Sequence, residues 1–301
     1  MHIYEKPLVN ASEKQKQQIE LLRSIFQSLP DADEKATSQA EREWNVNLNC
    51  LKNNILKGDP REFLRWDVVR KTMFVGNAEY INAELKYLKS HREWATRWAN
   101  AIHESKQGCP APYYRYMKSS GNLIHHAYHL ALFEDKTGLR INELSCIFEF
   151  GGGYGSMCRL VHNLGFKGKY VIFDLPNFSN LQKYYLSSLG LHVMAEGKHE
   201  AVNAIYCLDN LKDIGSIDIS GDKSLFIATW SLSESPLYIR EPLLPKIASC
   251  RSKLLAYQEI FGEVNNLNYF SSRPEFNSCP KLYNEEIKHL PGNRYLFGWS
   301  I

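Results

Sequence analysis

The sequence contains no CxxC pair, no apolar run long enough to cross a membrane and no strong excess of either charge. Its seven cysteines are widely spaced, which excludes zinc-ribbon and thioredoxin-like sites and favours reduced thiols in a reducing compartment. A net charge of +3 is too small to indicate a nucleic-acid or anionic-membrane surface. The N-terminus also lacks an apolar signal region. We therefore expect a cytoplasmic protein with no nucleic-acid partner and no membrane span.

The spacing of apolar residues changes near residue 110. Over residues 1–110 it has the period of helices, and about four helices with no strand are expected. Ser12 and Gln15 fit a capping box at the start of the first helix. "DPRE" fits the beginning of a helix over 59–73, and a longer helix is expected over 77–102. We interpret this region as a lid, a homodimer surface or both.

Residues 111–301 form the second predicted region, a single catalytic domain. A helix, "NLIHHAYHLALFEDKTG", capped by Asn122 and closed by Gly138, precedes strands predicted in "SCIFEF", "KYVIFDL", "SLFIATW" and "KLLAYQEI". "LHVMA" and "AIYCL" compete for the third strand, and "NLNYFSS" and "RYLFGWS" form a last pair. Strands alternating with helices indicate a parallel sheet covered on both faces. The predicted fold class is therefore α/β and doubly wound, with a mostly parallel sheet and an N-terminal all-helical region.

Four glycines fall in the five positions after the first predicted strand, in "FEFGGGYG" (Phe148–Gly155). In such sheets, ligands lie outside the carboxyl ends of the strands. Glycine permits backbone angles forbidden to other residues and lets a ligand approach where a Cβ would collide. The N–H groups of the following helix face the same space. The turn therefore predicts a nucleotide-like cofactor against Gly151, Gly153 and Gly155.

Asp174 ends the second predicted strand, about twenty residues after the glycines. A carboxylate at this place can accept the hydroxyls of a ribose. Capping of the next helix is the alternative, and the two roles are compatible. The G-x-G-x-x-G spacing of dinucleotide sites is not met, because Ser156 stands at its third glycine. An NAD-dependent oxidoreductase is therefore the weaker alternative, as is a non-catalytic binding protein of the same fold.

The spacing E-x-G-x-G-x-G, which begins at Glu149, resembles motif I of the Rossmann-like S-adenosylmethionine-dependent methyltransferases. The resemblance implies a seven-stranded sheet, with Glu149 near the amino-acid end of the cofactor and Asp174 on its ribose. A buried acid that caps nearby N–H groups is the alternative for Glu149, and either role requires a partner. The resemblance also assigns further residues to the cofactor site: Tyr154, Leu175, Asp209, Trp230 and Ser231.

The longer run "FEFGGGYGSMCRLVHNLGF…YVIFDLPNFSNLQKYYL" looks like the sugar O-methyltransferases of bacterial polysaccharide and antibiotic biosynthesis. "FLRW" (63–66) and "GNLIHHAYHLALFEDKTG" look like that group too, so the likeness covers most of the chain and is most specific over 148–186. It implies methyl transfer from S-adenosylmethionine to a sugar hydroxyl, with S-adenosylhomocysteine as product. No acids cluster at the predicted strand ends, so we expect no metal, unlike in catechol-type enzymes.

A general base would assist methyl transfer, because a protonated sugar hydroxyl is a poor nucleophile. His125 and His129 share one face of the predicted helix, and His126 points about 100° away. We predict His126 as the base and His125 as the second choice. Packing is the alternative role for these histidines, and a metal site there lacks a third ligand. Glu234 and Glu259, at the ends of the next two strands, are further catalytic candidates, although Glu234 also fits a helix N-terminus.

Overall fold

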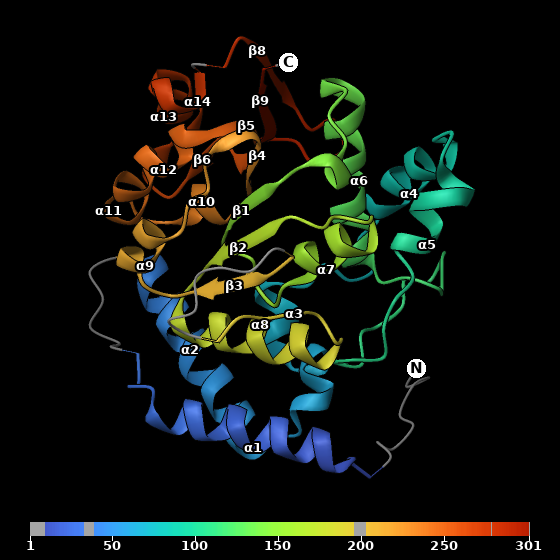
Figure 1. Ribbon diagram of the computed structural model, residues 1–301, viewed down its shortest axis with the longest axis vertical. Coiled ribbons are helices and arrows are strands. Elements are labelled where there is room, and N and C mark those ends of the chain that lie inside the picture. Colours follow the sequence, from blue (N-terminus) through green and yellow to red (C-terminus); the bar gives the residue numbers. More distant parts are fainter. Residues whose placement is uncertain (1–9, 33–38, 196–202, 278, 301) are drawn as a thin grey trace.

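A seven-stranded sheet runs through the protein, with helices on both faces (Figure 1). The computed structural model describes residues 10–32, 39–195, 203–277 and 279–300. The strand order is β3-β2-β1-β4-β5-β9-β8. These strands are β1 Cys146–Phe150, β2 Lys169–Phe173, β3 Ile205–Leu208, β4 Gly221–Thr229, β5 Cys250–Gln258, β8 Lys281–Glu286 and β9 Asn293–Trp299. A separate small ribbon pairs β6 Ile260–Phe261 with β7 Val264–Asn265.

The winding of the sheet reverses at β1. The chain moves from β1 through β2 to β3, and then returns to β4 on the other side of β1. The pairs from β3 to β5 are parallel, and β9 runs antiparallel to β5 and β8. This topology confirms the predicted fold class, a doubly wound and mostly parallel α/β sheet of Rossmann-like type.

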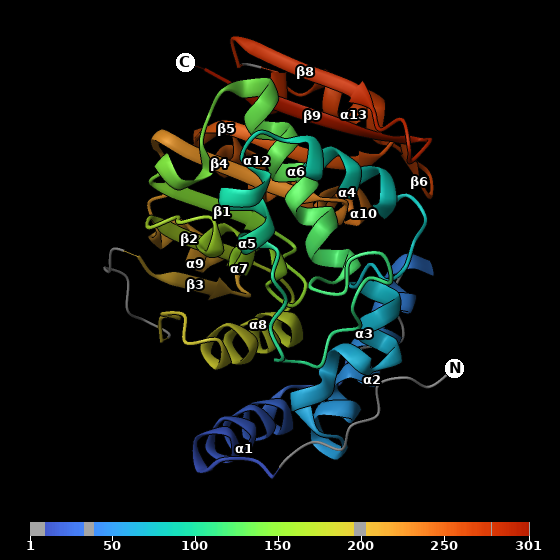
Figure 2. The ribbon, with the colours of Figure 1, turned by 90° about the vertical axis from the view of Figure 1, so that its right-hand side faces the viewer.

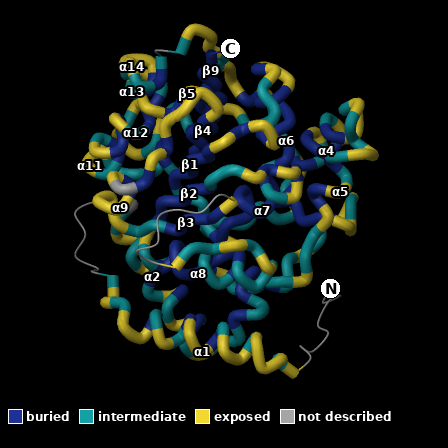
Figure 3. Tube along the Cα trace, in the orientation of Figure 1, coloured by how far each residue is buried: buried dark blue, intermediate teal, exposed yellow. Residues whose placement is uncertain are grey.

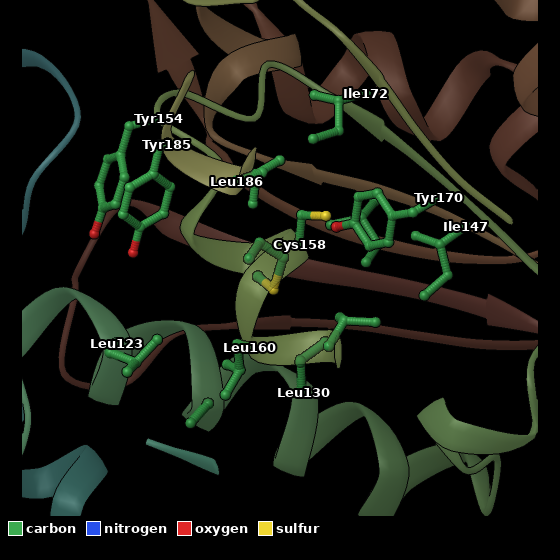
Figure 4. Close-up of a cluster of buried hydrophobic side chains, with 14 of the residues drawn as sticks. Leu123, Leu130, Ile147, Tyr154, Cys158, Leu160, Tyr170, Ile172, Tyr185 and Leu186 are labelled. Atoms are coloured by element: carbon green, nitrogen blue, oxygen red, sulfur yellow. The ribbon is translucent and has the colours of Figure 1, made fainter. Parts of the chain in front are cut away.

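Side chains of the strands alternate between two apolar layers, as the two-residue period of a strand requires. Along β2, Tyr170 and Ile172 join the layer that contains α6, α7 and α8, whereas Val171 and Phe173 join the layer that contains α9 and α12–α14. Figure 4 shows part of the first layer, and Figure 3 shows how deeply the central strands are buried. The helices are α6 Gly121–Thr137, α7 Ser156–Asn163, α8 Pro176–Ser188, α9 Leu211–Ser216, α10 Ser231–Glu234, α11 Leu237–Arg240, α12 Leu244–Ser249, α13 Asn266–Ser272 and α14 Pro274–Asn277.

The N-terminal helices pack against the sheet domain and share its core. Helices α1 (Glu13–Ser28) and α2 (Gln39–Lys57) lie beside α8 (Figures 1 and 2). The capping box is confirmed, since Ser12 Oγ accepts the N–H of Gln15 and the Gln15 side chain accepts the N–H of Ser12. Apolar residues of both helices belong to the same buried cluster as residues of β1 and β2. None of the described helices is long and apolar enough to span a membrane.

Two of the predicted N-terminal helices are broken. The helix expected over 59–73 is a 3-10 turn, Pro60–Arg65, followed by a separate helix, α3 (Asp67–Thr72). The helix expected over 77–102 divides into α4 (Ile81–Ser90), a π-helical turn and α5 (Ala99–Ala101). The break after α4 has a local cause: Glu93 N–H donates to Nδ1 of His91 at 3.1 Å, a side-chain bond that competes with the helix.

After β2, the structure resolves one open alternative and corrects the last predicted strand pair. "AIYCL" supplies β3, and "LHVMA" contributes only a bridge from Val193 to Ile205 among the described residues. "NLNYFSS" is helix α13 and not a strand, because Asn265 caps it and Phe270 is buried against Tyr257. The partner of β9 is β8.

The first turn of α6 also differs from the prediction. Ser120, and not Asn122, is the N-cap, since Ser120 Oγ accepts the N–H of Leu123. The predicted closing residue is confirmed, because Gly138 adopts a left-handed conformation with φ 75°. Asn122 instead accepts the N–H of Val75 and donates to the hydroxyl of Tyr154. It therefore ties α6 to the segment after α3 and to the glycine turn.

Candidate active site

A cavity of about 800 Å³ lies at the carboxyl ends of β1, β2 and β4, where the winding reverses. The glycine turn, Asp174 and the start of α10 form its sheet side, and α6 contributes His125 and His126. Trp44 of α2 and residues 71–75 line it from the N-terminal region. Its volume falls within the roughly 300–1,000 Å³ of typical small-molecule sites.

The glycine turn leaves no room for side chains. Gly151 and Gly153 have left-handed backbones, with φ of 72° and 56°. A Cβ on Gly151 would lie 2.2 Å from Cβ of Ser231, and one on Gly152 would lie 2.6 Å from Cγ2 of Ile172. Gly151 and Gly153 line the cavity as predicted, whereas Gly155 does not. A Cβ on Gly155 would meet the side chain of Leu186 at 3.2 Å, so this glycine lets α7 start close to α8.

Asp174 joins the turn to the end of β2. Its Oδ2 accepts the N–H of Gly153 and the Nε2–H of Gln182, each at 2.9 Å, and its Oδ1 accepts the N–H of Leu175 at 2.8 Å. Leu175, and not Asp174, is the N-cap residue of α8. Burial raises the pKa of Asp174 to about 7, although these three donors oppose the shift. The carboxyl lines the cavity.

Glu149 lines the cavity beside Asp174 and is almost completely buried. The hydroxyl of Tyr170 donates to its Oε2 at 2.9 Å, and this is the partner that burial of the acid requires. Burial raises the pKa of Glu149 to about 8; the Tyr170 bond opposes the shift, and Asp174 adds to it. Among the described residues, neither acid has a basic side chain within ion-pair distance.

Four of the five other predicted cofactor residues line the cavity and one does not. Tyr154 is buried, with its ring edge against Phe63. Leu175 is 36% exposed at the cavity wall. Ser231 lines the wall and donates to the carbonyl of Phe150 at 2.5 Å. Asp209 follows β3 and lies outside the lining.

Trp230 also lines the cavity and has a strained backbone, with φ 63° and ψ −40°. Such a conformation costs about 1–3 kcal/mol in a residue other than glycine. Its N–H donates to the carbonyl of Ala256 at 2.6 Å, and its indole N–H donates to Oδ1 of Asn293 at 2.7 Å. The indole stacks on the ring of His125, with centroids 5.2 Å apart and planes at 26°. The two hydrogen bonds therefore hold this strained residue with its indole ring stacked on His125.

The two predicted base residues have different surroundings. His125 Nδ1 lies 2.8 and 2.9 Å from the two carboxyl oxygens of Glu84, a fully buried residue of α4. His126 Nδ1 is buried without a hydrogen-bond partner among the described residues. Burial lowers the pKa of His126 to about 3, and the neighbouring His125 adds to the shift. The third histidine, His129, shares a hydrogen bond between its Nδ1 and the hydroxyl of Tyr295, and it lies outside the cavity lining.

The two predicted glutamates are separated. Glu234 lines the cavity, accepts a bond from Gln258 Nε2 at 3.2 Å, and has a pKa raised by burial. Glu259 lies outside the cavity lining and pairs with Arg294 at 3.1 Å. In the described part of the chain, no three His, Cys, Asp or Glu side chains gather as metal ligands.

Sequence reasoning missed Glu84, which contacts His125, and Tyr170, which contacts Glu149. A signal for Glu84 exists: it stands on the same helical stripe as Ile81 and Leu88, where an acid is unusual. Tyr170 carries no local signal, because a tyrosine in a buried strand is ordinary.

No family model and no curated protein matches the chain. Among solved structures, it is similar to a candidate sarcosine dimethylglycine methyltransferase from Galdieria sulphuraria at 19% identity, covering 44% of this chain and 49% of that one, with a TM-score of 0.33. It is also similar to the bifunctional kinase-methyltransferase WbdD, at 10% identity, 60% and 38% coverage, and a TM-score of 0.38. It is also similar to PigF, solved with SAH, at 11% identity, covering 95% of this chain and 96% of that one, with a TM-score of 0.38.

The chain thus spans about half the length of the Galdieria protein and 38% of WbdD. Similarities at this level do not assign the chain to a family. What the structure itself establishes is a doubly wound, seven-stranded α/β fold with a cavity at its switch point.

Proposed function

We propose that the protein is an S-adenosylmethionine-dependent O-methyltransferase that acts on a hydroxyl of a sugar or glycan precursor. One observation carries the proposal: Glu149 and Asp174 are buried carboxyl groups on the cavity wall with no basic partner among the described residues. A buried carboxylate requires a compensating charge. S-adenosylmethionine carries an ammonium and a sulfonium group, and its ribose carries two hydroxyl donors.

One wall of the cavity, which we call the glycine wall, consists of Glu149, Gly151–Gly153, Asp174 and Leu175. Its residues fit this cofactor. Glu149 is suited to its ammonium group, and Asp174 to its ribose. The bare main chain of Gly151–Gly153 allows close approach, and Leu175 offers an apolar surface for the base. When bound, the cofactor supplies an electrophilic methyl group. The protein then has to exclude water, hold the acceptor oxygen in line and remove its proton.

The same wall argues against the NAD-dependent alternative. The pyrophosphate of a dinucleotide is an anion, and it would face Glu149 and Asp174 with no cation supplied by the glycine turn. Lys71, which lines the cavity from α3, is exposed. Ser156 in place of the third glycine adds to this argument.

The remaining lining suits a sugar as the acceptor. Aromatic rings alternate with hydrogen-bonding groups there, as recognition of sugar C–H faces and hydroxyls requires. The lining residues of this half include Glu41, Trp44, Asn45, Trp230, Glu234 and Tyr238. The N-terminal helix α2 supplies three of them, which supports a role for the N-terminal region as a lid over the acceptor.

His125 is the better general base, ahead of His126. Burial leaves His126 a weak proton acceptor, with a pKa of about 3 and an unpartnered Nδ1. Glu84 holds Nδ1 of His125, so Nε2 is left to take the proton of the acceptor hydroxyl. Glu234, with its raised pKa, is suited to binding a sugar hydroxyl beside it.

Calorimetric titration with S-adenosylhomocysteine tests the cofactor assignment. We expect micromolar binding to the wild-type protein, a loss of about 100-fold in Asp174→Ala, and no binding of NADH. Asp174→Asn is the matched variant, because its amide oxygen still accepts the Gly153 bond. Folded wild-type protein that binds NADH and not S-adenosylhomocysteine would refute the proposal. Cofactor binding without methyl transfer to any sugar of a broad panel would favour the non-catalytic alternative.

A further inference from the structure

We infer that Glu84 and His289 assist His125 in its role as general base. Glu84 positions His125, and His289 carries the positive charge that keeps Glu84 ionised while His125 stays neutral. The inference rests on the proposed function, because methyl transfer to a hydroxyl releases a proton that a group at the site has to accept. It assigns a role in the reaction to α4 and to the turn between β8 and β9.

The three side chains come from distant parts of the chain. Glu84 lies on α4, His125 on α6, and His289 in the turn after β8. One oxygen, Oε1 of Glu84, lies 2.8 Å from Nδ1 of His125 and 2.9 Å from Nε2 of His289. Side-chain exposure rises from 0% at Glu84 and 4% at His125 to 19% at His289. These three side chains, which we call the His125–Glu84–His289 unit, therefore connect the cavity with the protein surface.

Charge balance requires one protonated imidazole in this unit. Burial raises the pKa of Glu84, but the two histidines more than offset this, and the pKa is lowered. No lysine or arginine pairs with Glu84 among the described residues, so a histidine has to supply the compensating charge. His289 is the more exposed of the two, and water stabilises the imidazolium there. His125 is then neutral, as a base has to be.

The geometry also selects the tautomer of His125. Both carboxyl oxygens of Glu84 lie within 2.9 Å of Nδ1, so Nδ1–H donates and the lone pair is on Nε2. Nε2 has no hydrogen bond to a described residue, and the ring lines the cavity. Trp230 and Tyr80 pack against the ring at 5.2 and 5.5 Å between centroids and hold its plane.

In this arrangement, only one of the two histidines, His125 or His289, is protonated at a time. As the acceptor oxygen bonds to the methyl carbon, its proton moves to Nε2 of His125, and the electron pair of the broken C–S bond stays on sulfur. His289 then loses a proton to water, so Glu84 remains ionised and the net charge of the unit is unchanged. After the product leaves, His125 releases its proton and His289 takes one up from water, which restores the starting state.

Neighbouring groups do not disturb this balance near neutral pH. The other titratable side chains that face the ring of His125 are Tyr80, His126 and His129. Burial raises the pKa of Tyr80 to about 12, lowers that of His126 to about 3, and lowers that of His129 well below its usual value. All three are therefore uncharged, and Glu84 and His289 are the charged groups that act on His125.

Long-range ¹H–¹⁵N NMR of the histidine-labelled protein tests the inference without a known acceptor. His125→Gln identifies the signals of that ring, and S-adenosylhomocysteine is added as the probe of the cofactor site. We expect the Nδ1–H tautomer in the wild-type protein. Glu84→Gln is expected to move the titration midpoint of His125 down by about 1–3 pH units, and His289→Gln to move it up by a similar amount. The exposed His103→Gln serves as the control and leaves the midpoint unchanged.

Opposite shifts are the signature, because a purely structural role would move both variants in the same direction or neither. An Nε2–H tautomer of His125, or a downward shift in His289→Gln, would overturn the inference. His289 is partly exposed, so its variant carries the test even if Glu84→Gln does not fold. S-adenosylhomocysteine that binds while the shifts are absent refutes this inference alone, whereas failure to bind refutes the proposed function.

Discussion

The cavity has two walls, and a buried glutamate is associated with each: Glu149 lines the glycine wall, whereas Glu84 lies behind His125, which lines the histidine wall. The two acids differ in their electrostatic state. On the glycine wall, Glu149 has a tyrosine hydroxyl as its partner, and burial raises its pKa to about 8. Behind the histidine wall, Glu84 has two imidazole partners, and its pKa is lowered in spite of burial. The first acid lacks a countercharge and the second has one supplied by the protein.

This difference indicates that the glycine wall, and not the histidine wall, needs a ligand to supply its countercharge. Because burial favours the neutral form of Glu149, we expect the glycine wall to favour ligands that supply a positive charge. Glu84 is already ionised, so the histidine wall is organised before any ligand binds, as catalytic groups generally need to be. The comparison therefore supports the proposed roles, cofactor binding at the glycine wall and proton transfer at the histidine wall.

The largest expected effect comes from filling the glycine wall. Gly153→Val places a branched side chain on a backbone with φ 56°, next to Met73 in the cavity lining. We expect affinity for S-adenosylhomocysteine to fall by about 100-fold or more, because the cofactor loses its space. Calorimetric titration measures this loss.

Gly190→Val is the matched control for backbone strain. Gly190 has φ 78°, and a Cβ there would have no neighbour within 4 Å. It lies after α8 and outside the cavity lining. We expect reduced stability in both variants and lost binding only in Gly153→Val. Equal affinity in the two variants would break the assignment of binding to the glycine wall.

A smaller effect is expected from neutralising Glu149. In the unliganded protein its pKa of about 8 lies above the ordinary value of 4.5, so the folded state holds a proton that the unfolded state has released. Stability from this group is present below pH 4.5 and is lost as pH rises through 8. Binding of an ammonium group favours the ionised form, so affinity has the opposite trend and rises by up to about tenfold per pH unit below 8.

Glu149→Gln should remove both of the trends that Glu149 causes. We expect its affinity for S-adenosylhomocysteine at pH 8 to be about 10–100-fold weaker, and to depend on pH only through Asp174, whose pKa is about 7. Its unliganded melting temperature should change less between pH 5 and 8 than that of the wild type. Tyr170→Phe is the control, because it keeps the carboxyl and hence the pH dependence. An affinity that still rises from pH 7 to pH 8 in Glu149→Gln as steeply as in the wild type would show that another group binds the cation.

The two walls also differ in how far the sequence predicts them. The glycine wall lies within Phe148–Asp174, one strand–turn–helix–strand unit in which local spacing encodes the geometry. The histidine wall joins α4, α6 and the turn after β8, and no local pattern brings Glu84 and His289 together. The sequence pointed to the histidine cluster, but the choice between His125 and His126 depended on partners more than forty residues away.

Secondary structure follows the same rule. The capping box and the four strands predicted in "SCIFEF", "KYVIFDL", "SLFIATW" and "KLLAYQEI" follow from local patterns, and the structure confirms them. The helix "NLNYFSS" was predicted as a strand because its aromatic residues favour strands, and burial of Phe270 against Tyr257 decided otherwise. The cap of α6 was misassigned by two residues, since Asn122 serves a tertiary contact to Tyr154.

The smallest effect is expected at Glu259, the predicted catalytic acid that belongs to neither wall. Its side chain is 32% exposed and pairs with Arg294, which is 22% exposed. Pairs near the surface contribute about 0–1 kcal/mol, so Glu259→Gln should change the free energy of unfolding by no more than that. Cofactor affinity and the titration of His125 should both equal the wild-type values. A tenfold loss of affinity in this variant would place the cofactor beyond the cavity described above, and the contrast between the two walls would then not describe the active site.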